Sequence, residues 1–235
     1  MMFVKSLLPL VLVFTGAVAY ADQQSASQSP VVLDEELWVT FYDLPSRRFR
    51  AIRTAILTRN NESAARDLAV TANYLSVESD RSSATFQAPL RDIVEQLRQK
   101  EAAVDTVTLE ELDALFGRAH WLLAQHYLEL ARQARDARQS RNTSLYLWAT
   151  THHMERAMLW SNVAVTREAQ TALEGLRKVA GELQNPATSA RAYKERPVVR
   201  AEKLLRKIGK QIDRRVILPV AETTSNKPDT DQPDS

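Results

Sequence analysis

Apolar residues recur every three to four positions along most of this chain, which is the pattern of amphipathic α-helices. The first such stretch covers residues 34–59, with Phe49 and Ile56 among its apolar positions. Pro45 lies inside it, and a proline removes a backbone donor and breaks a helix interior. We therefore expect a short helix to about Leu44 and a longer one from Ser46.

A second helix is predicted from Glu62 to about Val77, after the polar turn at Asn60-Asn61. Alanines dominate its inner face, and small side chains let two helices approach closely. The sequence therefore predicts a helical hairpin here. Residues 78–87 are expected to form a loop, and Pro89 to open the next helix, since proline is favoured in a first helical turn.

Three longer helices follow, over residues 109–138, 144–183 and 197–216. Thr108 and Glu111 have the spacing of a capping box, which marks the start of the first of them. No run of strand-type alternation interrupts this pattern. The prediction is an all-α fold, a bundle of five to six helices.

The centre of this bundle is predicted to be a long antiparallel hairpin, with residues 109–138 packed against 144–183 in the manner of a coiled coil. The polar turn near residue 140 joins the two helices. Leu122 and Leu159 are both expected in the apolar seam between them.

The amino-acid composition agrees with a helical fold and excludes several classes of function. Only five of the 235 residues are glycine, and hydrophobic residues make up 44%. The absence of cysteine excludes disulfides, cysteine-ligated metals and thiol catalysis. A formal net charge of +2 is too balanced to indicate a nucleic-acid partner.

The two ends of the chain differ from its middle. Residues 1–21 have the basic start, the short apolar run and the A-x-A site of a signal peptide, with cleavage expected after Ala21. We expect a disordered linker at 22–31, one helical domain at 32–218 and a disordered acidic tail at 219–235. The processed chain is then expected in the periplasm or secreted, with no transmembrane segment.

The sharpest candidate for chemistry is a cluster in the central hairpin. If the turn lies near residue 140, His126 is level with Glu155, and His152 is one turn away from Glu155. Imidazole and carboxylate groups suit a transition metal, and bundle interiors hold such sites. The other interpretation is a buried polar layer that fixes helix register. His120 and His153 are expected to be partly exposed rings beside aromatic residues.

The second candidate is the basic C-terminal stretch, where ten basic residues oppose three acidic ones between residues 191 and 215. On an amphipathic helix such a face contacts an anionic surface, such as lipid headgroups. The alternative is a docked helix with a solvated basic face. The candidate contact residues are Arg200, Lys203, Arg206, Lys207, Lys210 and Arg214.

No nucleotide-binding, nucleophile or metalloprotease motif is present. The sequence therefore favours a protein that is not an enzyme and needs no cofactor, apart from the possible metal. It favours an exported binding or stress-protective module with a protein partner or self-association.

The segment FRAIRTAILTRNNESAARDLAVTANYLS resembles the opening helical hairpin of the YfdX family of exported bacterial proteins. The similarity covers residues 48–89. That family usually has a glycine in the turn, where this chain has Asn60 and Asn61, and its pattern does not extend to the long central hairpin. The resemblance implies a stress-associated or chaperone-like protein and transfers no catalytic residue.

Overall fold

The computed structural model describes residues 42–185, 188 and 196–217. The predicted signal peptide, the linker and the acidic tail lie outside these residues. Within them all regular structure is helical, which confirms the all-α bundle. The elements are α2 (Leu44–Leu57), α3 (Asn61–Arg81), α4 (Ala84–Ala102), the 3₁₀ turn η1 (Val104–Thr106), α5 (Leu109–Asp136), α6 (Ser140–Trp160), α7 (Arg167–Gln184) and α9 (Arg196–Ile217).

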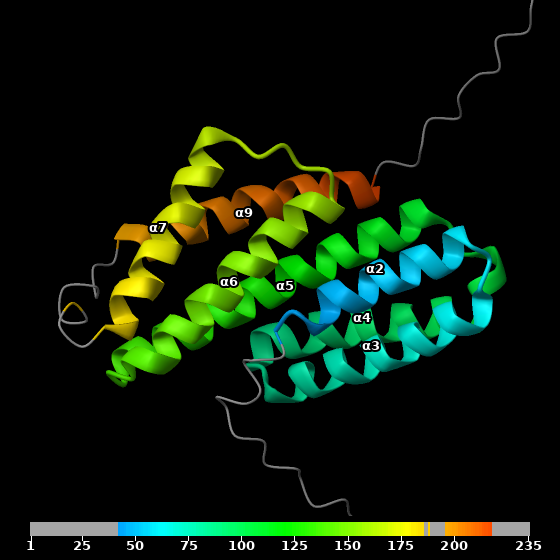
Figure 1. Cartoon of the computed structure of the whole chain (residues 1–235), viewed down its shortest axis with the longest axis horizontal. Helices are drawn as coiled ribbons and strands as arrows, with labels where there is room; N and C mark the ends of the chain where they lie inside the picture. The colour runs from blue at the N-terminus through cyan, green and yellow to red at the C-terminus, as the bar shows by residue number, and fades with distance from the viewer. Residues whose placement is uncertain (1–41, 186–187, 189–195, 218–235) are drawn as a thin grey trace, which may run out of the picture. The chain divides into compact units, whose positions relative to one another are not determined.

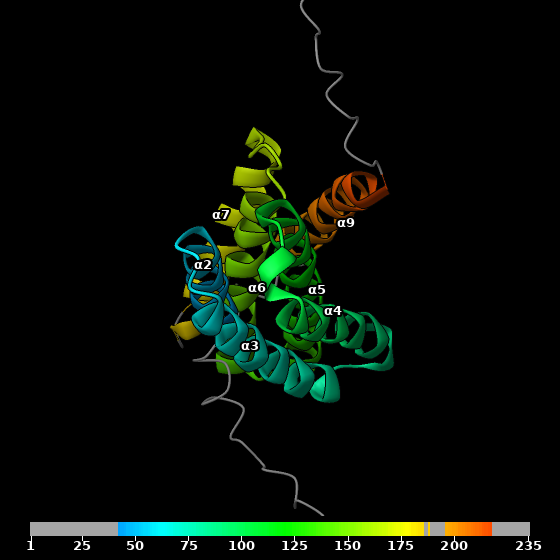
Figure 2. The same ribbon diagram turned by 90° about the vertical axis from the view of Figure 1, so that its right-hand side faces the viewer.

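The antiparallel pair α5 and α6 forms the centre of the bundle, as the sequence predicts (Figure 1). Helices α2, α3 and α4 pack on one side of this pair, and α7 and α9 on the other (Figure 2). The described helices belong to one compact unit by their mutual contacts. None of them combines the length and the apolar character needed to cross a bilayer.

The prediction of one long helix over residues 144–183 is wrong, because the structure has two helices there. Helix α6 ends at Trp160, and α7 begins at Arg167. Asn162 adopts a left-handed backbone with φ of 49° just after the end of α6. Thr166 caps the next helix by accepting a hydrogen bond from the Ala169 amide. The described part of the bundle therefore has seven α-helices instead of five or six.

Two smaller boundaries also differ. Pro45 lies in the first turn of α2, where a residue without a backbone N–H group breaks no helical hydrogen bond. The helix therefore includes Pro45, although the sequence predicted its start at Ser46. The loop predicted at 78–87 is mostly helical, because α3 continues to Arg81 and α4 begins at Ala84. Pro89 consequently lies inside α4.

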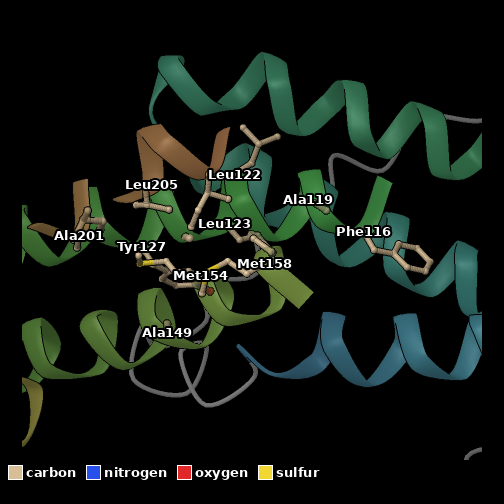
Figure 3. Close-up of a cluster of buried hydrophobic side chains, with 14 of the residues drawn as sticks. Phe116, Ala119, Leu122, Leu123, Tyr127, Ala149, Met154, Met158, Ala201 and Leu205 are labelled. Carbon is tan, nitrogen blue, oxygen red and sulfur yellow. The ribbon is translucent and has the colours of Figure 1, made fainter. Parts of the chain in front are cut away.

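The core lies where the two central helices meet their neighbours. In the close-up, Leu123 and Tyr127 of α5 lie near Met154 and Met158 of α6, and Phe116 lies further along α5 (Figure 3). A further layer comes from α9, whose buried residues are Val198, Ala201, Leu204, Leu205, Ile208 and Ile212.

The seam of the hairpin is only partly as predicted. Leu122 is buried, but Leu159 is 63% exposed. The buried face of α6 is carried by Leu147, Met154 and Met158 instead. The apolar stripe of α6 is therefore rotated relative to the prediction.

Candidate functional site

The structure does not bring His126, His152 and Glu155 together. The Nε2 atom of His126 lies 3.5 Å from a carboxylate oxygen of Glu78 on α3. Glu155 forms an ion pair with Arg177 of α7. The two residues that were predicted to be level thus face different helices.

His152 points toward the start of α2. Its Nε2 atom lies 2.7 Å from the Ser46 hydroxyl and 3.0 Å from Asp43 Oδ1. Burial lowers the pKa of His152, although the Asp43 carboxylate acts in the opposite direction. Across the described ranges, no group of three or more histidine, aspartate or glutamate side chains is arranged to hold a metal ion.

The histidines that do meet are His120 and His153, which were predicted to be partly exposed. Both are fully buried, and their Nδ1 atoms lie 2.9 Å apart. Burial lowers the pKa of both imidazoles well below the ordinary value, and neighbouring positive groups add to the effect. The pair therefore stays neutral, with one Nδ1–H donating to the other Nδ1.

A second buried polar group is centred on Glu78, which has no exposed surface. Its carboxylate accepts hydrogen bonds from the hydroxyls of Tyr127, at 2.6 Å, and Tyr74, at 3.0 Å. Burial and this carboxylate raise the pKa of both tyrosines well above the ordinary value, so each hydroxyl keeps its proton. The Tyr127 ring stacks on His153 with centroids 5.4 Å apart, which joins the two buried groups.

These contacts favour the buried polar layer over a reactive centre. The side chains bond to one another across α3, α5 and α6. They fix how these helices pack, because a helix rotation would leave a buried carboxylate without donors.

A different arrangement is open to a ligand. A cavity of about 430 Å³ lies between α2, the start of α5 and the end of α6. Its lining includes three arginines, Arg50, Arg53 and Arg156, and the hydroxyl of Ser46. We call it the arginine cavity.

The charges in the arginine cavity are only partly compensated. Arg53 donates to Asp113 with an Nε–Oδ1 distance of 3.2 Å. Arg50 and Arg156 form no ion pair with any carboxylate in the part of the chain that the structure describes. Both guanidinium groups nevertheless act on His152, whose pKa they lower.

The lining of the arginine cavity also includes apolar side chains, which we call its apolar wall. They are Leu57, Leu159 and Trp160. Leu57 and Leu159 are 60% and 63% exposed, among the largest exposures of any large apolar side chain described. Trp160 is held edge-on by Phe116, with ring centroids 5.3 Å apart.

The predicted basic face lies on α9. Arg200, Lys203, Arg206 and Lys210 are exposed, opposite the buried face of the helix. Lys207 is also exposed and forms an ion pair with Glu168 of α7 at 2.9 Å. Arg214 lies within the helix, but its side chain is outside the described residues.

Sequence reading missed the arginine cavity, although part of the signal was visible. Arg50 and Arg53 are three positions apart, so they share one face of a helix. Arg156 and Trp160 lie more than a hundred positions later and approach only through helix packing. No pattern within one helix indicates that meeting.

Comparison of the chain with known protein families, with curated protein sequences and with solved structures finds no match.

Proposed function

We propose that this chain is an exported helical protein that acts by binding, and that its ligand is a small organic anion. The expectation of export comes from the sequence of residues 1–21. The observation that carries the ligand class is the arginine cavity, where Arg50 and Arg156 have no carboxylate partner among the described residues and apolar side chains share the lining.

The charge of the cavity favours an anion. A carboxylate or phosphate between Arg50 and Arg156 would receive charge-assisted hydrogen bonds, which are about twice as strong as neutral ones. Arginine is well suited to this because its planar donors match the two oxygens of such a group.

The apolar wall favours an anion that carries a hydrocarbon or aromatic part. Contact with Leu57, Leu159 and Trp160 would remove apolar surface from water on both sides, at roughly 25 cal/mol per Å². A volume of about 430 Å³ falls within the usual range of small-molecule pockets. An inorganic ion would leave most of this space unused.

Isothermal titration calorimetry of the processed chain tests the proposal. Octanoate and phenylacetate are titrated beside their uncharged alcohols, octanol and phenylethanol. We expect the carboxylates to bind and the alcohols to bind at least about tenfold more weakly, which corresponds to about 1.4 kcal/mol. Equal binding of acid and alcohol, or no binding of either, would contradict the proposal.

The matched variants separate the cavity from general surface charge. The double variant Arg50→Gln/Arg156→Gln removes the two guanidinium groups of the cavity that have no carboxylate partner in the described ranges. Arg98→Gln/Arg167→Gln removes the same charge from exposed positions outside the cavity lining. Carboxylate binding should be lost in the first variant and kept in the second.

A second candidate function is contact with an anionic membrane surface through α9. It is favoured by the basic side chains at positions 200, 203, 206 and 210, which are exposed and have no carboxylate partner among the described residues. The processed chain should co-sediment with vesicles that contain anionic lipid and leave them as salt is raised. Replacing the four residues by glutamine should abolish co-sedimentation. Vesicle binding that changes neither with salt nor with these substitutions would exclude this function.

A further inference from the structure

A second cavity lies beside the arginine cavity. It has a volume of about 380 Å³ and is lined by residues of α5, the end of α6 and α9, among them Glu110, Ser161, Asn162 and Ile212. Asp113 and Trp160 line both cavities. The two cavities therefore share a wall, and we call the second one the acidic cavity.

The described lining residues of the two cavities carry opposite charge. Arg50 and Arg156 line only the first, and Glu110 lines only the second. The ion pair between Arg53 and Asp113 marks the boundary between them. Glu110 is exposed and forms no ion pair in the region that the structure describes. A ligand that spans the boundary thus meets cations at one end and carboxylates at the other.

Asp113 itself is poorly stabilised as an anion. Desolvation raises the pKa of its carboxyl group, although the Arg53 guanidinium acts in the opposite direction. The Arg53 guanidinium alone does not fully offset the free-energy cost of removing the Asp113 carboxylate from water. An additional positive group in the acidic cavity would stabilise it further.

Trp160 adds a reason for the cation to be an organic ammonium. An indole ring attracts a cation held over its face more strongly than any other aromatic side chain, and most strongly when the cation carries little water. The Trp160 ring is fixed by edge-on contacts with Phe116 and Phe49, at 5.3 and 6.4 Å between centroids. A rigid indole beside two carboxylates is a combination that suits an alkylated ammonium group.

From this juxtaposition we propose that the ligand is a zwitterion, with an alkylammonium group in the acidic cavity and its anionic group in the arginine cavity. The proposal rests on the function proposed above, since it places the anionic end at the same arginines. It adds the chemical class of the other end. Glu110, Asp113 and Trp160 hold the ammonium group, and Arg50 and Arg156 hold the carboxylate or phosphate.

Three probes of one chain length test this by calorimetry on the processed chain. They are ω-trimethylammonio-hexanoate, hexanoate and hexyltrimethylammonium, which carry both charges, the anion only and the cation only. We expect the zwitterion to bind at least about tenfold more tightly than either single-charge probe, because each end contributes a separate ionic contact. An ω-trimethylammonio phosphate of the same length then distinguishes a carboxylate from a phosphate at the anionic end.

A matched pair of variants identifies the cationic end. Glu110→Gln should weaken binding of the zwitterion by roughly three- to tenfold, since an exposed charge contributes modestly to affinity. Binding of hexanoate should be unchanged. Glu174→Gln removes an equally exposed carboxylate of α7 outside both cavities and should change neither. Circular dichroism of each variant should match that of the parent chain.

The outcomes separate the two proposals. If hexanoate binds as tightly as the zwitterion, or if Glu110→Gln has no effect, the zwitterion proposal is wrong and the anion proposal stands. If hexyltrimethylammonium alone binds and Arg50→Gln/Arg156→Gln has no effect on the zwitterion, the anion proposal is wrong. If none of the probes binds, both are wrong.

Discussion

His120 and His153 face each other through their Nδ1 atoms, 2.9 Å apart, at a point in the core that has no exposed surface. One ring must donate and the other accept, so the pair holds a single proton between these atoms. The Nε2 atom of each ring is also buried and has no hydrogen-bond partner in the part of the chain that the structure describes. The pair is thus neutral, and a proton added at Nε2 would find no acceptor among these residues.

This arrangement predicts that the fold loses stability in mild acid. Burial lowers the pKa of both imidazoles in the folded chain, with positive groups such as His152 and Arg156 adding to the effect. Below about pH 6.5, the pKa of histidine in an unfolded chain, the unfolded chain binds protons that the folded chain does not bind. The free energy of unfolding therefore falls as pH falls. Between pH 7 and pH 5, each imidazole should contribute a loss of about 2 kcal/mol.

Urea unfolding followed by tryptophan fluorescence at the two pH values measures this loss. In the variant His120→Leu/His153→Leu the loss should be several-fold smaller, since neither chain state binds the two protons. Glu111 titrates below this window, because its pKa is about 2, held low mainly by the hydrogen bond from Lys100. An equal pH dependence in parent and variant would show that the pair is not responsible.

The buried carboxylate of Glu78 predicts a large effect from a single oxygen. Tyr127→Phe removes the hydroxyl that donates to it at 2.6 Å and leaves the ring in place. Because the acceptor is a carboxylate with no exposed surface, the variant should lose about 2–3 kcal/mol of unfolding free energy. Chemical denaturation at pH 7 provides the measurement.

A double-mutant cycle shows whether the loss comes from this contact. In a Glu78→Gln background the acceptor is neutral, so Tyr127→Phe should cost about 1 kcal/mol or less. A cost that is the same in both backgrounds would mean that the hydroxyl acts through something other than the carboxylate.

Helix positions were largely predictable from the sequence, but one helix end was not. The capping box of Thr108 and Glu111 is present with both of its hydrogen bonds, because its geometry is local. The end of α6 was missed because Asn162 occupies the left-handed position where glycine is most common. The amide of Val163 bonds to the Met158 carbonyl there, and that of Asn162 to Leu159, which completes a Schellman motif. The motif depends on a backbone conformation that the side chains scarcely indicate.

The candidate site was less predictable because it depends on which way each helix faces. An apolar stripe that includes His152 and Leu159 is consistent with the pattern of α6, yet Leu159 is 63% exposed. The buried face uses Met154 and Met158, each one position before the predicted Glu155 and Leu159. A rotation of one residue, about 100°, separates the two interpretations. It moved the predicted His126 and Glu155 apart and brought His120 and His153 together.

The same helix-end geometry makes Arg138 a site for stabilisation. It follows α5 with φ of 56°, and its amide and that of Gln139 bond back to Arg135 and Ala134. A side chain at such a backbone angle is strained, so Arg138→Gly should raise the free energy of unfolding by about 0.5–1 kcal/mol. Arg98→Gly, at an exposed position inside α4, should lower it by about 1 kcal/mol. A loss in both variants would indicate that the backbone at Arg138 is not left-handed.

The docking of α9 depends on a glycine that a helix would otherwise disfavour. A Cβ atom on Gly209 would lie 2.4 Å from Trp121 Cζ2, and this indole donates to the Leu205 carbonyl at 2.9 Å. Gly209→Ala therefore has to displace Trp121 or α9, and we expect a loss of about 1–3 kcal/mol. Gly181→Ala in α7 is the matched control, because its Cβ would meet nothing within 4 Å. That variant should gain about 0.5–1 kcal/mol from helix propensity alone. Thermal unfolding of both variants measures the contrast. Stabilisation by both substitutions would mean that α9 does not pack against Trp121 as closely as these distances require.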